Sequence, residues 1–374
     1  MCPYEMPKAR YIMIGGFLGA GKTTAILKLA EHLAGQGRTV GLITNDQSVG
    51  LVDTAMLGAH GFPVQEITGG CFCCRFNSLV DAASQLSKET RPDAFIAEPV
   101  GSCTDLKASV SYPLRRIYGD DFSIAPLSVL IDPVRALRVL GLEQGNAFSP
   151  KVIYVYKKQL EEAELIVVNK IDLLTPDRRK TLRDALARQY PKATIYEVSA
   201  RNGTGLGEWF EAIAGADLGS DPSMEVDYEL YAEGEALLGW LNCTVSISGD
   251  EPTDGNTLLR QLASRVQAAI ESQGEIAHLK MTLSPGESGN DLAVLNLVRN
   301  DHHAEMSHEL AEPIESGDLI LNLRAEADPQ MLHSVVTRAI AETIAALPGW
   351  RYTIDHEEHF RPGKPQPTHR FAEA

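Results

Sequence analysis

The sequence predicts an α/β protein in which a parallel sheet, with helices on both faces, is followed by a smaller α+β domain. Over the first 215 residues, short apolar strands alternate with helical patterns, which is typical of a parallel sheet covered on both sides. A glycine-rich turn joins the first strand to the first helix. After a polar segment at 215–227, hairpin-like strands and two longer helices follow, and this change favours a second domain.

Length and composition narrow the class of protein. The chain has 374 residues and a net charge of −16, so we expect two domains and no nucleic-acid partner, since such binding needs clustered Lys and Arg. No run of 18 apolar residues exists, which predicts no membrane association. The N-terminus lacks the apolar core of a signal peptide, and we therefore expect a cytoplasmic protein.

The elements of the first domain, assigned to residues 1–218, follow in order. Each strand is a short apolar run that ends before a turn or a helical pattern. The strands are predicted at 11–16, 39–44, 94–98, 127–132, 165–169 and 194–199, and the first helix at 23–34. The helical stretches that fall between most of these strands supply the crossover connections that a parallel sheet requires.

The second domain, assigned to residues 227–374, has a different pattern. Its strands are predicted at 241–248, 278–283, 292–298 and 319–325, and its helices at 255–272 and 329–347. The loop over 284–291 resembles a hairpin connection. This order indicates an α+β domain, for which a ferredoxin-like arrangement is one interpretation. The proline-rich segment from Phe360 onward is expected to be a tail or a strap.

The glycine-rich turn carries the phosphate-loop motif G-x-x-x-x-G-K-[ST] between a strand and a helix. Glycines let backbone N–H groups converge on phosphate oxygens, Lys22 can neutralise the β- and γ-phosphates, and the Thr23 hydroxyl can bind Mg²⁺. The sheet is therefore expected to be that of a P-loop NTPase. The predicted nucleotide contacts in this loop are Gly16, Gly19, Ala20, Gly21, Lys22, Thr23 and Thr24.

A second motif predicts that the base is guanine. "NKID" places Asn169, Lys170 and Asp172 at the end of a strand. One carboxylate, Asp172, can accept hydrogen bonds from both the N1–H and the 2-amino group of guanine, whereas adenine offers neither donor there. Ser199 and Ala200 follow at the next strand end, where a backbone N–H could contact the guanine oxygen.

Two regions are expected to sense the γ-phosphate. Asp46 follows the second strand and Asp53 lies seven residues later. Either carboxylate could reach Mg²⁺, and either could instead cap a turn. Glu98 ends a strand, and Gly101 completes a Glu-x-x-Gly spacing in which the glycine N–H could contact the γ-phosphate. We predict Lys22, Glu98 and Asp46 as the catalytic set, with Thr23, Asp46 and Glu98 at Mg²⁺.

Three cysteines, Cys71, Cys73 and Cys74, lie within four residues. Thiolates suit Zn²⁺ and similar transition metals, and three ligands leave one position open for exchange. A redox pair and plain core packing are the alternatives. Cys103 could be a further ligand or a packed thiol, and packing is the preferred interpretation. The histidines at 301–309 and 356–359 are interpreted as solvated loops rather than as accessory metal sites.

These motifs together resemble those of the CobW, HypB and UreG group of metal-handling GTPases, and the "GFLGAGKTT" and Cys-x-Cys-Cys forms are closest to its CobW-like branch. The resemblance covers about residues 10–215. It implies that Lys22 and Thr23 hold phosphate and Mg²⁺, that Glu98 and Gly101 form a switch, and that the cysteines hold a transition metal. The sequence departs from the CobW-like pattern at Asn45–Asp46, which is closer to the urease and hydrogenase branches.

The expected function is a slow GTPase that binds zinc or a cobalt-type metal and couples GTP hydrolysis to metal delivery or to assembly of a metallocofactor such as cobalamin. Its expected cofactors are GTP or GDP, Mg²⁺, and Zn²⁺ or another transition metal. Its expected partner is a client metalloprotein or a cofactor-assembly protein, and a homodimer is an open alternative. A metal- or redox-responsive regulator and a small-molecule kinase are the competing interpretations.

Overall fold

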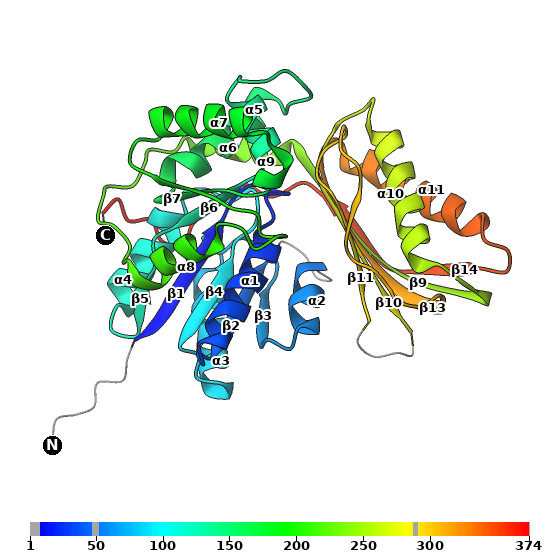
Figure 1. Cartoon of the computed structure of the whole chain (residues 1–374), viewed down its shortest axis with the longest axis horizontal. Coiled ribbons are helices and arrows are strands. Elements are labelled where there is room, and N and C mark those ends of the chain that lie inside the picture. The colour runs from blue at the N-terminus through cyan, green and yellow to red at the C-terminus, as the bar shows by residue number, and fades with distance from the viewer. Residues whose placement is uncertain (1–7, 47–51, 287–290, 374) are drawn as a thin grey trace.

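The computed structural model describes residues 8–46, 52–286 and 291–373. Parts of three predicted features lie outside these ranges: the N-terminal stretch, the first γ-phosphate-sensing region and the loop over 284–291. Within the described residues the chain forms two sheets that stand side by side (Figure 1). No described helix is long and apolar enough to cross a lipid bilayer. The predicted domain boundaries, 1–218 and 227–374, stay predictions.

The first sheet is parallel, as predicted. Its order is β3-β2-β4-β1-β6-β7-β8, and β5 also pairs with β1. The strands are β1 (Ala9–Gly15), β2 (Val40–Asn45), β3 (Val64–Ile67), β4 (Ala94–Glu98), β5 (Phe122–Ile124), β6 (Ser128–Ile131), β7 (Leu165–Val168) and β8 (Thr194–Glu197). Strands β2, β3 and β4 lie on one side of β1, and β6, β7 and β8 lie on the other. The loop after β1 therefore lies where the strand order reverses, which is the usual place of a ligand site in such sheets.

Helices cover both faces of this sheet. They are α1 (Lys22–Gly35), α2 (Val52–Ala59), α3 (Phe76–Glu89), α4 (Tyr112–Tyr118), α5 (Pro133–Val139), α6 (Pro150–Glu162), α7 (Pro176–Gln189) and α8 (Leu206–Gly215), with single turns at Lys107–Ser111 and Ile171–Leu173. Alternate residues of β1 enter opposite cores: Ile12 and Ile14 pack with α1 and α8, whereas Tyr11 and Met13 pack with α3 and α6. This period of two explains why the strands are apolar throughout.

The second sheet is antiparallel, in the order β12-β11-β10-β13-β9-β14. Its elements are β9 (Leu238–Thr253), α10 (Gly255–Ile270), β10 (Glu275–Pro285), β11 (Ala293–Leu297), β12 (Glu305–His308), β13 (Ile314–Glu326), α11 (Pro329–Ala345) and β14 (Arg351–Phe360). The central order β10-β13-β9-β14 with two crossover helices is the ferredoxin-like split βαβ arrangement. β11 and β12 extend it on one edge.

One face of the second sheet is apolar and the other is polar. Helices α10 and α11 pack on the apolar face around Leu241, Leu279, Met281 and Leu321. Asp254 and Asp328 are the N-cap residues of these helices, and their carboxylates accept hydrogen bonds from free backbone N–H groups of the first turn. The opposite face is turned toward the parallel-sheet domain, with β10 and β11 close to that domain (Figure 1).

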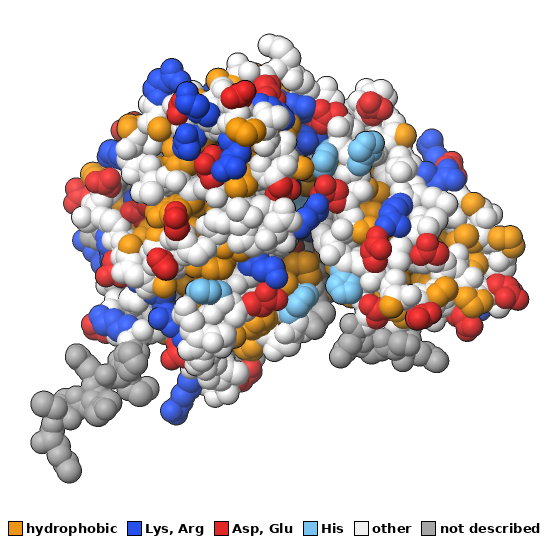
Figure 2. All heavy atoms as spheres, viewed as in Figure 1, with side chains coloured by type: hydrophobic (Ala, Val, Ile, Leu, Met, Phe, Trp, Pro, Cys, Tyr) orange, Lys and Arg blue, Asp and Glu red, His pale blue; other side chains and the backbone are white. Residues whose placement is uncertain are grey.

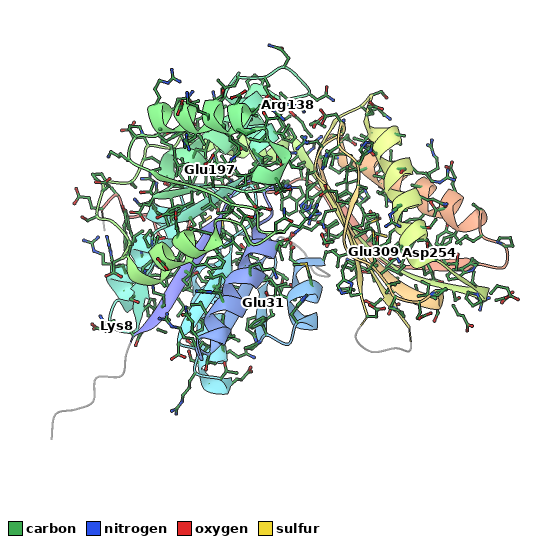
Figure 3. All side chains as sticks on the ribbon, in the orientation of Figure 1. Lys8, Glu31, Arg138, Glu197, Asp254 and Glu309 are labelled. Atoms are coloured by element: carbon green, nitrogen blue, oxygen red, sulfur yellow. The ribbon has the colours of Figure 1, made fainter. Side chains whose placement is uncertain are left out.

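Two arginines of helix α5 connect the two domains, one through hydrogen bonds to carbonyl oxygens and one through an ion pair. Arg135 on α5 is 4% exposed and donates to the carbonyl oxygens of Leu18 at 2.9 Å and of Ala277 at 3.3 Å, which joins the phosphate loop to β10. On the same helix, Arg138, which is labelled in Figure 3, pairs with Asp301 of the second domain. Figure 2 shows a hollow at this seam, with charged and histidine side chains on both sides.

Candidate functional site

The phosphate loop lies between β1 and α1 and depends on its glycines. Gly16, Gly19 and Gly21 have φ values of 129°, 80° and 87°, a region that side chains rarely adopt. A Cβ on Gly16 would lie 2.2 Å from the Leu130 oxygen, and one on Gly21 would lie 2.5 Å from the Asn169 side-chain nitrogen. The loop therefore leaves its backbone N–H groups and the start of α1 facing a pocket, where an anion is stabilised.

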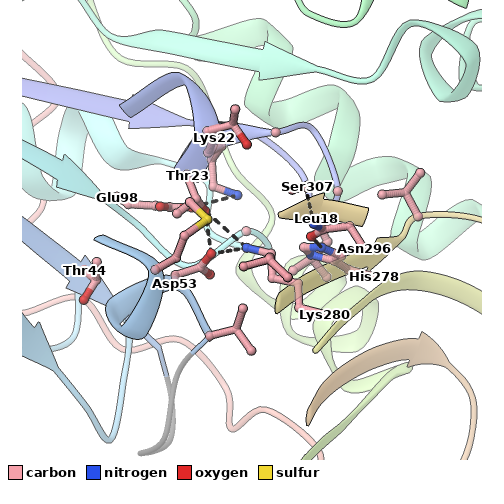
Figure 4. A pocket seen from close by; sticks show the side chains of 18 of the residues that line it. Leu18, Lys22, Thr23, Thr44, Asp53, Glu98, His278, Lys280, Asn296 and Ser307 are labelled. Carbon is pink, nitrogen blue, oxygen red and sulfur yellow. Dashed lines mark hydrogen bonds and ion pairs between the residues drawn. The ribbon is translucent and has the colours of Figure 1, made fainter. Parts of the chain in front are cut away.

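Three oxygen-bearing side chains meet at the start of α1 (Figure 4). The Thr23 hydroxyl lies 2.5 Å from Asp53 Oδ1 and 3.2 Å from Glu98 Oε1. Lys22 Nζ lies 3.7 Å from the same Glu98 oxygen. The other oxygen of Glu98, Oε2, is buried and has no hydrogen-bond partner among the described residues. A hydroxyl with two carboxylates is the hard oxygen set that Mg²⁺ prefers, so these residues fit that ion.

The two aspartates of the first sensing region have different surroundings. Asp53, in the first turn of α2, contacts Thr23, whereas Asp46 accepts a hydrogen bond from Arg324 of the second domain at 3.0 Å. Asp46 as a Mg²⁺ ligand stays a prediction, and Asp53 is the carboxylate that this structure places beside Thr23. Burial and the nearby Asp53 charge raise the pKa of Glu98 to about 7.

The predicted base-binding residues gather around a cavity of about 550 Å³, next to the phosphate pocket. Asn169 ties three loops together, because its amide donates to the Ala20 oxygen and accepts from the Ala200 N–H, both at 2.9 Å. Lys170 Nζ donates to the Gly19 oxygen at 2.7 Å. The exposed Asp172 lines the cavity together with Ser199 and Ala200. The cavity therefore presents the Asp172 carboxylate close to the phosphate loop, with Glu31 and Glu305 elsewhere in its lining, and recognition of guanine by Asp172 stays a prediction.

Gly101 lies in the turn after β4, against the phosphate loop. A Cβ at this position would lie 2.8 Å from Leu18 Cδ2 and 3.1 Å from the Leu18 backbone nitrogen, so a larger residue would require Leu18 to shift. Its carbonyl oxygen accepts a hydrogen bond from Gln159 at 2.9 Å. The Glu-x-x-Gly segment is thus in direct contact with the loop whose occupancy it was predicted to sense.

The three cysteines form one compact group at the start of α3. The Sγ atoms of Cys71 and Cys73 lie 2.9 Å apart, those of Cys71 and Cys74 lie 3.2 Å apart, and those of Cys73 and Cys74 lie 3.7 Å apart. The turn is closed by the Cys71 carbonyl, which accepts from the N–H groups of Cys74 and Arg75. Three converging thiols fit a soft transition-metal ion.

Cys103, two residues after Gly101, lies beside this group. Its thiol is 1% exposed, as expected for the packing interpretation. It also interacts with the cysteine group: hydrogen bonds from Cys103, Cys73 and Cys74 hold the pKa of Cys71 well below its usual range. A lowered thiol pKa favours the thiolate, the form that binds metal. The residue is therefore both packed and adjacent to the predicted ligands.

The proline-rich tail is a strap over the cysteines. The backbone N–H of Gln366 lies 3.2 Å from Cys74 Sγ, and that of Thr368 donates to the Cys73 oxygen at 2.8 Å. Phe371 N–H donates to the Ala108 oxygen at 2.8 Å. In Figure 1 the red C-terminal segment runs from the second domain back to the parallel-sheet domain.

Sequence reasoning missed the wall that the second domain adds to the phosphate pocket. His278 and Lys280 on β10 and Asn296 on β11 line this pocket (Figure 4). Lys280 Nζ contacts Asp53 and lies 3.2 Å from the Thr23 hydroxyl. Burial holds the pKa of His278 well below its usual range. The available signal was the alternation of polar and apolar residues in "HLKMTL" (278–283), which places His278 and Lys280 together on the polar face of the strand.

The structure also changes the predictions for the two histidine segments, 301–309 and 356–359. His333 Nδ1 and His359 Nδ1 lie 3.0 Å and 2.9 Å from the two oxygens of Glu357, and the three groups are close enough to share an ion. The segment predicted as a solvated loop at 356–359 is part of strand β14. The segment predicted as a solvated loop at 301–309 contains strand β12 (Glu305–His308), and within it His302 pairs with Glu305 at 3.4 Å.

Comparison with known proteins gives a family match over the first half of the chain. The model of the CobW/HypB/UreG nucleotide-binding domain matches residues 10–197. The zinc chaperone YeiR of Escherichia coli (strain K12) is 30% identical over 172 residues, 46% of this chain and 49% of YeiR. The zinc chaperone CobW of a Sinorhizobium species is 32% identical over 214 residues, 51% of this chain and 58% of CobW. The chain thus spans about half the length of these curated relatives.

Among solved structures, Zn(II)-bound YjiA GTPase from E. coli aligns over 89% of this chain and 99% of its own, at 14% identity and a TM-score of 0.39. HypB from Helicobacter pylori in complex with nickel aligns over 55% of this chain and 85% of its own, at 16% identity and a TM-score of 0.40.

Proposed function

Since this chain belongs to the CobW/HypB/UreG family of nucleotide-binding domains, we propose that it is a GTPase that carries a transition metal on Cys71, Cys73 and Cys74. GTP hydrolysis would control delivery of that metal to a client metalloprotein or to assembly of a metallocofactor such as cobalamin. Zinc is the metal that we favour, because the relatives YeiR and CobW are zinc chaperones.

One observation carries the coupling part of this proposal. The side-chain amide of Asn45, at the end of β2, donates to the Ile67 oxygen at 3.0 Å and to the Gly70 oxygen at 2.8 Å. Gly70 directly precedes Cys71, and Asn45 directly precedes Asp46. On the other side, Cys103, which interacts with Cys71, follows the Glu-x-x-Gly segment. Both predicted sensing segments are therefore connected to the turn that carries the thiols, which gives a physical route for nucleotide to alter metal affinity.

The roles of the nucleotide residues follow from their positions. Lys22 and the N–H groups of the phosphate loop would bind the phosphates, and Asp172 would accept from guanine. Thr23, Glu98 and one of Asp46 and Asp53 would hold Mg²⁺, which when bound neutralises charge that develops on the transferred phosphoryl group. Glu98 could also orient water. We expect slow intrinsic hydrolysis, because neither a water-orienting glutamine nor an arginine finger can be picked out in the sequence.

Base specificity is tested by Asp172→Asn. An asparagine amide cannot accept from both guanine donors, but it can donate to the 2-carbonyl of xanthine. We expect the variant to lose GTP affinity by about tenfold or more and to gain XTP affinity, since one unpaired buried donor costs on the order of 1–3 kcal/mol. Fluorescence titration with labelled GTP and XTP measures both. Asp177→Asn, on the exposed first turn of α7, is the matched control, and unchanged base preference in Asp172→Asn would contradict guanine recognition.

Metal coupling is tested with Co²⁺ as a spectroscopic substitute for Zn²⁺. Thiolate ligands give intense near-ultraviolet charge-transfer absorption, whereas a His–Glu–His set such as that at His333 and His359 does not. We expect thiolate-type Co²⁺ binding in wild type, loss of that signal in a Cys71→Ser, Cys73→Ser, Cys74→Ser variant, and different affinities with a GTP analogue and with GDP. Equal affinities in the two nucleotide states would count against a coupled carrier and favour the metal-responsive regulator.

A further inference from the structure

Lys280 brings a positive charge from the second domain into the oxygen group at the start of α1. Its ammonium contacts Asp53 Oδ1 and lies 3.2 Å from the Thr23 hydroxyl (Figure 4). Those two oxygens, with Glu98 Oε1 at 3.2 Å from the hydroxyl, belong to the set that fits Mg²⁺. A side-chain cation of this protein is thus bound to ligands that a divalent cation would use.

The strand register aims Lys280 at this place. On β10, Leu279 and Met281 are fully buried in the core beneath α10 and α11, so the period of two turns Lys280 to the opposite face. Its side chain is only 14% exposed. Removing an ammonium from water is costly unless a charge partner is present, and Asp53 is that partner. The lysine is therefore held in the pocket by a specific ion pair.

The charge of the ammonium also offsets the repulsion between two carboxylates, Asp53 and Glu98. The charge of Asp53 adds to burial in raising the pKa of Glu98, while Lys22 and Lys280 act in the opposite direction. Either a lysine or a divalent cation can supply the missing positive charge, but both together would repel each other at these short distances.

We propose that Lys280 competes with Mg²⁺ for Thr23 and Asp53, so that binding of Mg²⁺ with the nucleotide expels the lysine and loosens the second sheet from α2. This inference rests on the proposed GTPase function and adds a role for the second domain. Besides the Lys280–Asp53 pair, the contact to be loosened includes the hydrogen bond that Val52 N–H donates to the Asn322 side chain at 3.0 Å. By linkage, whatever displaces the second sheet would tighten Mg²⁺-dependent nucleotide binding by the same factor.

The alternative role for Lys280 makes the opposite prediction. If the ammonium bound a phosphate of the nucleotide while Mg²⁺ was present, it would strengthen Mg²⁺·GTP binding, and its removal would weaken that binding. In the competition proposed here, removal of the ammonium strengthens it. The sign of one measured affinity change therefore separates the two roles.

The test compares Lys280→Met with wild type. Dissociation constants for a non-hydrolysable GTP analogue are measured with Mg²⁺ and with EDTA. The value in EDTA divided by the value in Mg²⁺ gives the factor by which Mg²⁺ strengthens binding. We expect this ratio to rise by about tenfold in Lys280→Met, the scale of one hydrogen bond to a charged group. Lys280→Arg, which keeps the charge, should stay near the wild-type ratio. Lys180→Met, on the exposed face of α7, controls for loss of a positive charge.

Circular dichroism and thermal unfolding verify that each variant is folded, and Lys280→Gln serves as a second neutral variant should methionine destabilise the chain. An unchanged ratio, or weaker Mg²⁺·GTP binding in both neutral variants, would overturn the competition. A wild-type protein that binds no guanine nucleotide would contradict the proposed function itself, so the two failures are distinguishable.

Discussion

Glu162 ends α6 inside the protein, where a carboxylate is costly. Its side chain is 5% exposed, and it accepts hydrogen bonds from Lys107 N–H and from the Thr104 hydroxyl, both at 3.1 Å. Burial, with the neighbouring charge of Asp105, raises the pKa of Glu162 to about 8. The two hydrogen bonds oppose this shift but do not cancel it.

This shift predicts a pH-dependent stability. A pKa that is higher in the folded than in the unfolded state stabilises the fold fully below the unfolded value of 4.5, and the contribution disappears as pH rises through about 8. Wild type should therefore lose stability between pH 4.5 and about pH 8 more steeply than Glu162→Gln, which cannot ionise, and the two should run parallel above that range. Thermal unfolding midpoints across that range measure the two slopes.

The neighbouring Glu161 provides the matched control for this prediction. It lies on the same helix with its side chain 48% exposed and paired with Lys158, so Glu161→Gln should leave the wild-type slope unchanged. Parallel slopes for wild type and Glu162→Gln would show that Glu162 does not titrate in this range.

At the residue scale, the sequence predicted residue types better than their partners. The phosphate-loop glycines and Asp172 lie around adjoining pockets because short motifs on strand ends fix them locally. The choice between Asp46 and Asp53 could not be made, because it depends on Arg324 and Lys280, which approach from the other domain. No local pattern carries that information, since the interacting residues are more than 200 positions apart.

At the element scale, the tail is the feature with the most direct functional consequence. It adds no strand or helix of its own, yet its backbone covers Cys73 and Cys74 with hydrogen bonds. His369 packs edge-on against Phe76 at a ring distance of 5.0 Å, and Arg370 pairs with the buried Asp105 at 2.7 Å. These contacts hold the strap against the turn that carries the thiols.

Truncation after Pro365 should expose the cysteine group. We expect alkylation of Cys74, which is half-buried, to become several-fold faster when the strap is removed, since its sulfur loses the cover of Gln366. Mass spectrometry after timed labelling measures each cysteine separately. Cys243, buried in the other domain, is the internal control and should react at its original rate. A Cys74 rate equal to that of the full chain would mean that the strap does not limit access.

The elements that sequence patterns missed share one property: their patterns are weak. β3 is four residues long and three of these are only half-buried. β14 is an edge strand in which polar and charged residues predominate, and five of its ten residues are exposed. Edge strands have one unpaired side and need no apolar alternation to be stable, so "DHEEH" gave no strand signal. The buried strands and the long amphipathic helices were predicted because burial imposes a period on them.

At the scale of the whole molecule, Arg135 holds the interface between the two sheets. Besides Leu18 and Ala277, its guanidinium donates to the Ile276 oxygen at 3.3 Å, and it lies 4.8 Å from the Phe148 ring centroid. These acceptors come from both domains. A planar group with five donors can serve all of them, and lysine cannot.

Arg135→Met should therefore destabilise the interface, because buried carbonyl oxygens in both domains would be left without donors. We expect a loss of about 3 kcal/mol in the free energy of unfolding and faster proteolysis in the 216–227 segment. Arg138→Met, on the same helix but paired with the partly exposed Asp301, should cost no more than about 1 kcal/mol. Urea denaturation and limited digestion with a glutamate-specific protease, which can cut after Glu225 in that segment, check both. Equal losses in the two variants would contradict a special role for Arg135.

The arrangement of the two domains could not be predicted from the sequence. Interface contacts such as Arg135 to Ala277 join positions 142 residues apart, and each is a single polar contact without periodicity. The fold class of each domain was predictable because it depends on repeated patterns within short segments. The wall that the second sheet adds to the phosphate pocket depends on how two finished domains pack.

The tail and α9 (Tyr228–Ala236) give the second sheet two attachments to the first domain. α9 packs on α6, with Gly234 against the Lys151 backbone, and the tail returns to the cysteine turn. Residues 238–360, which form the second sheet and its two helices, are therefore an insertion between two segments that are both attached to the first domain. A body tethered at both ends can pivot about the line that joins its anchors but cannot drift away. Any opening over the phosphate pocket would then be a hinged rotation, and one of the two hinge points would rest on the thiols themselves.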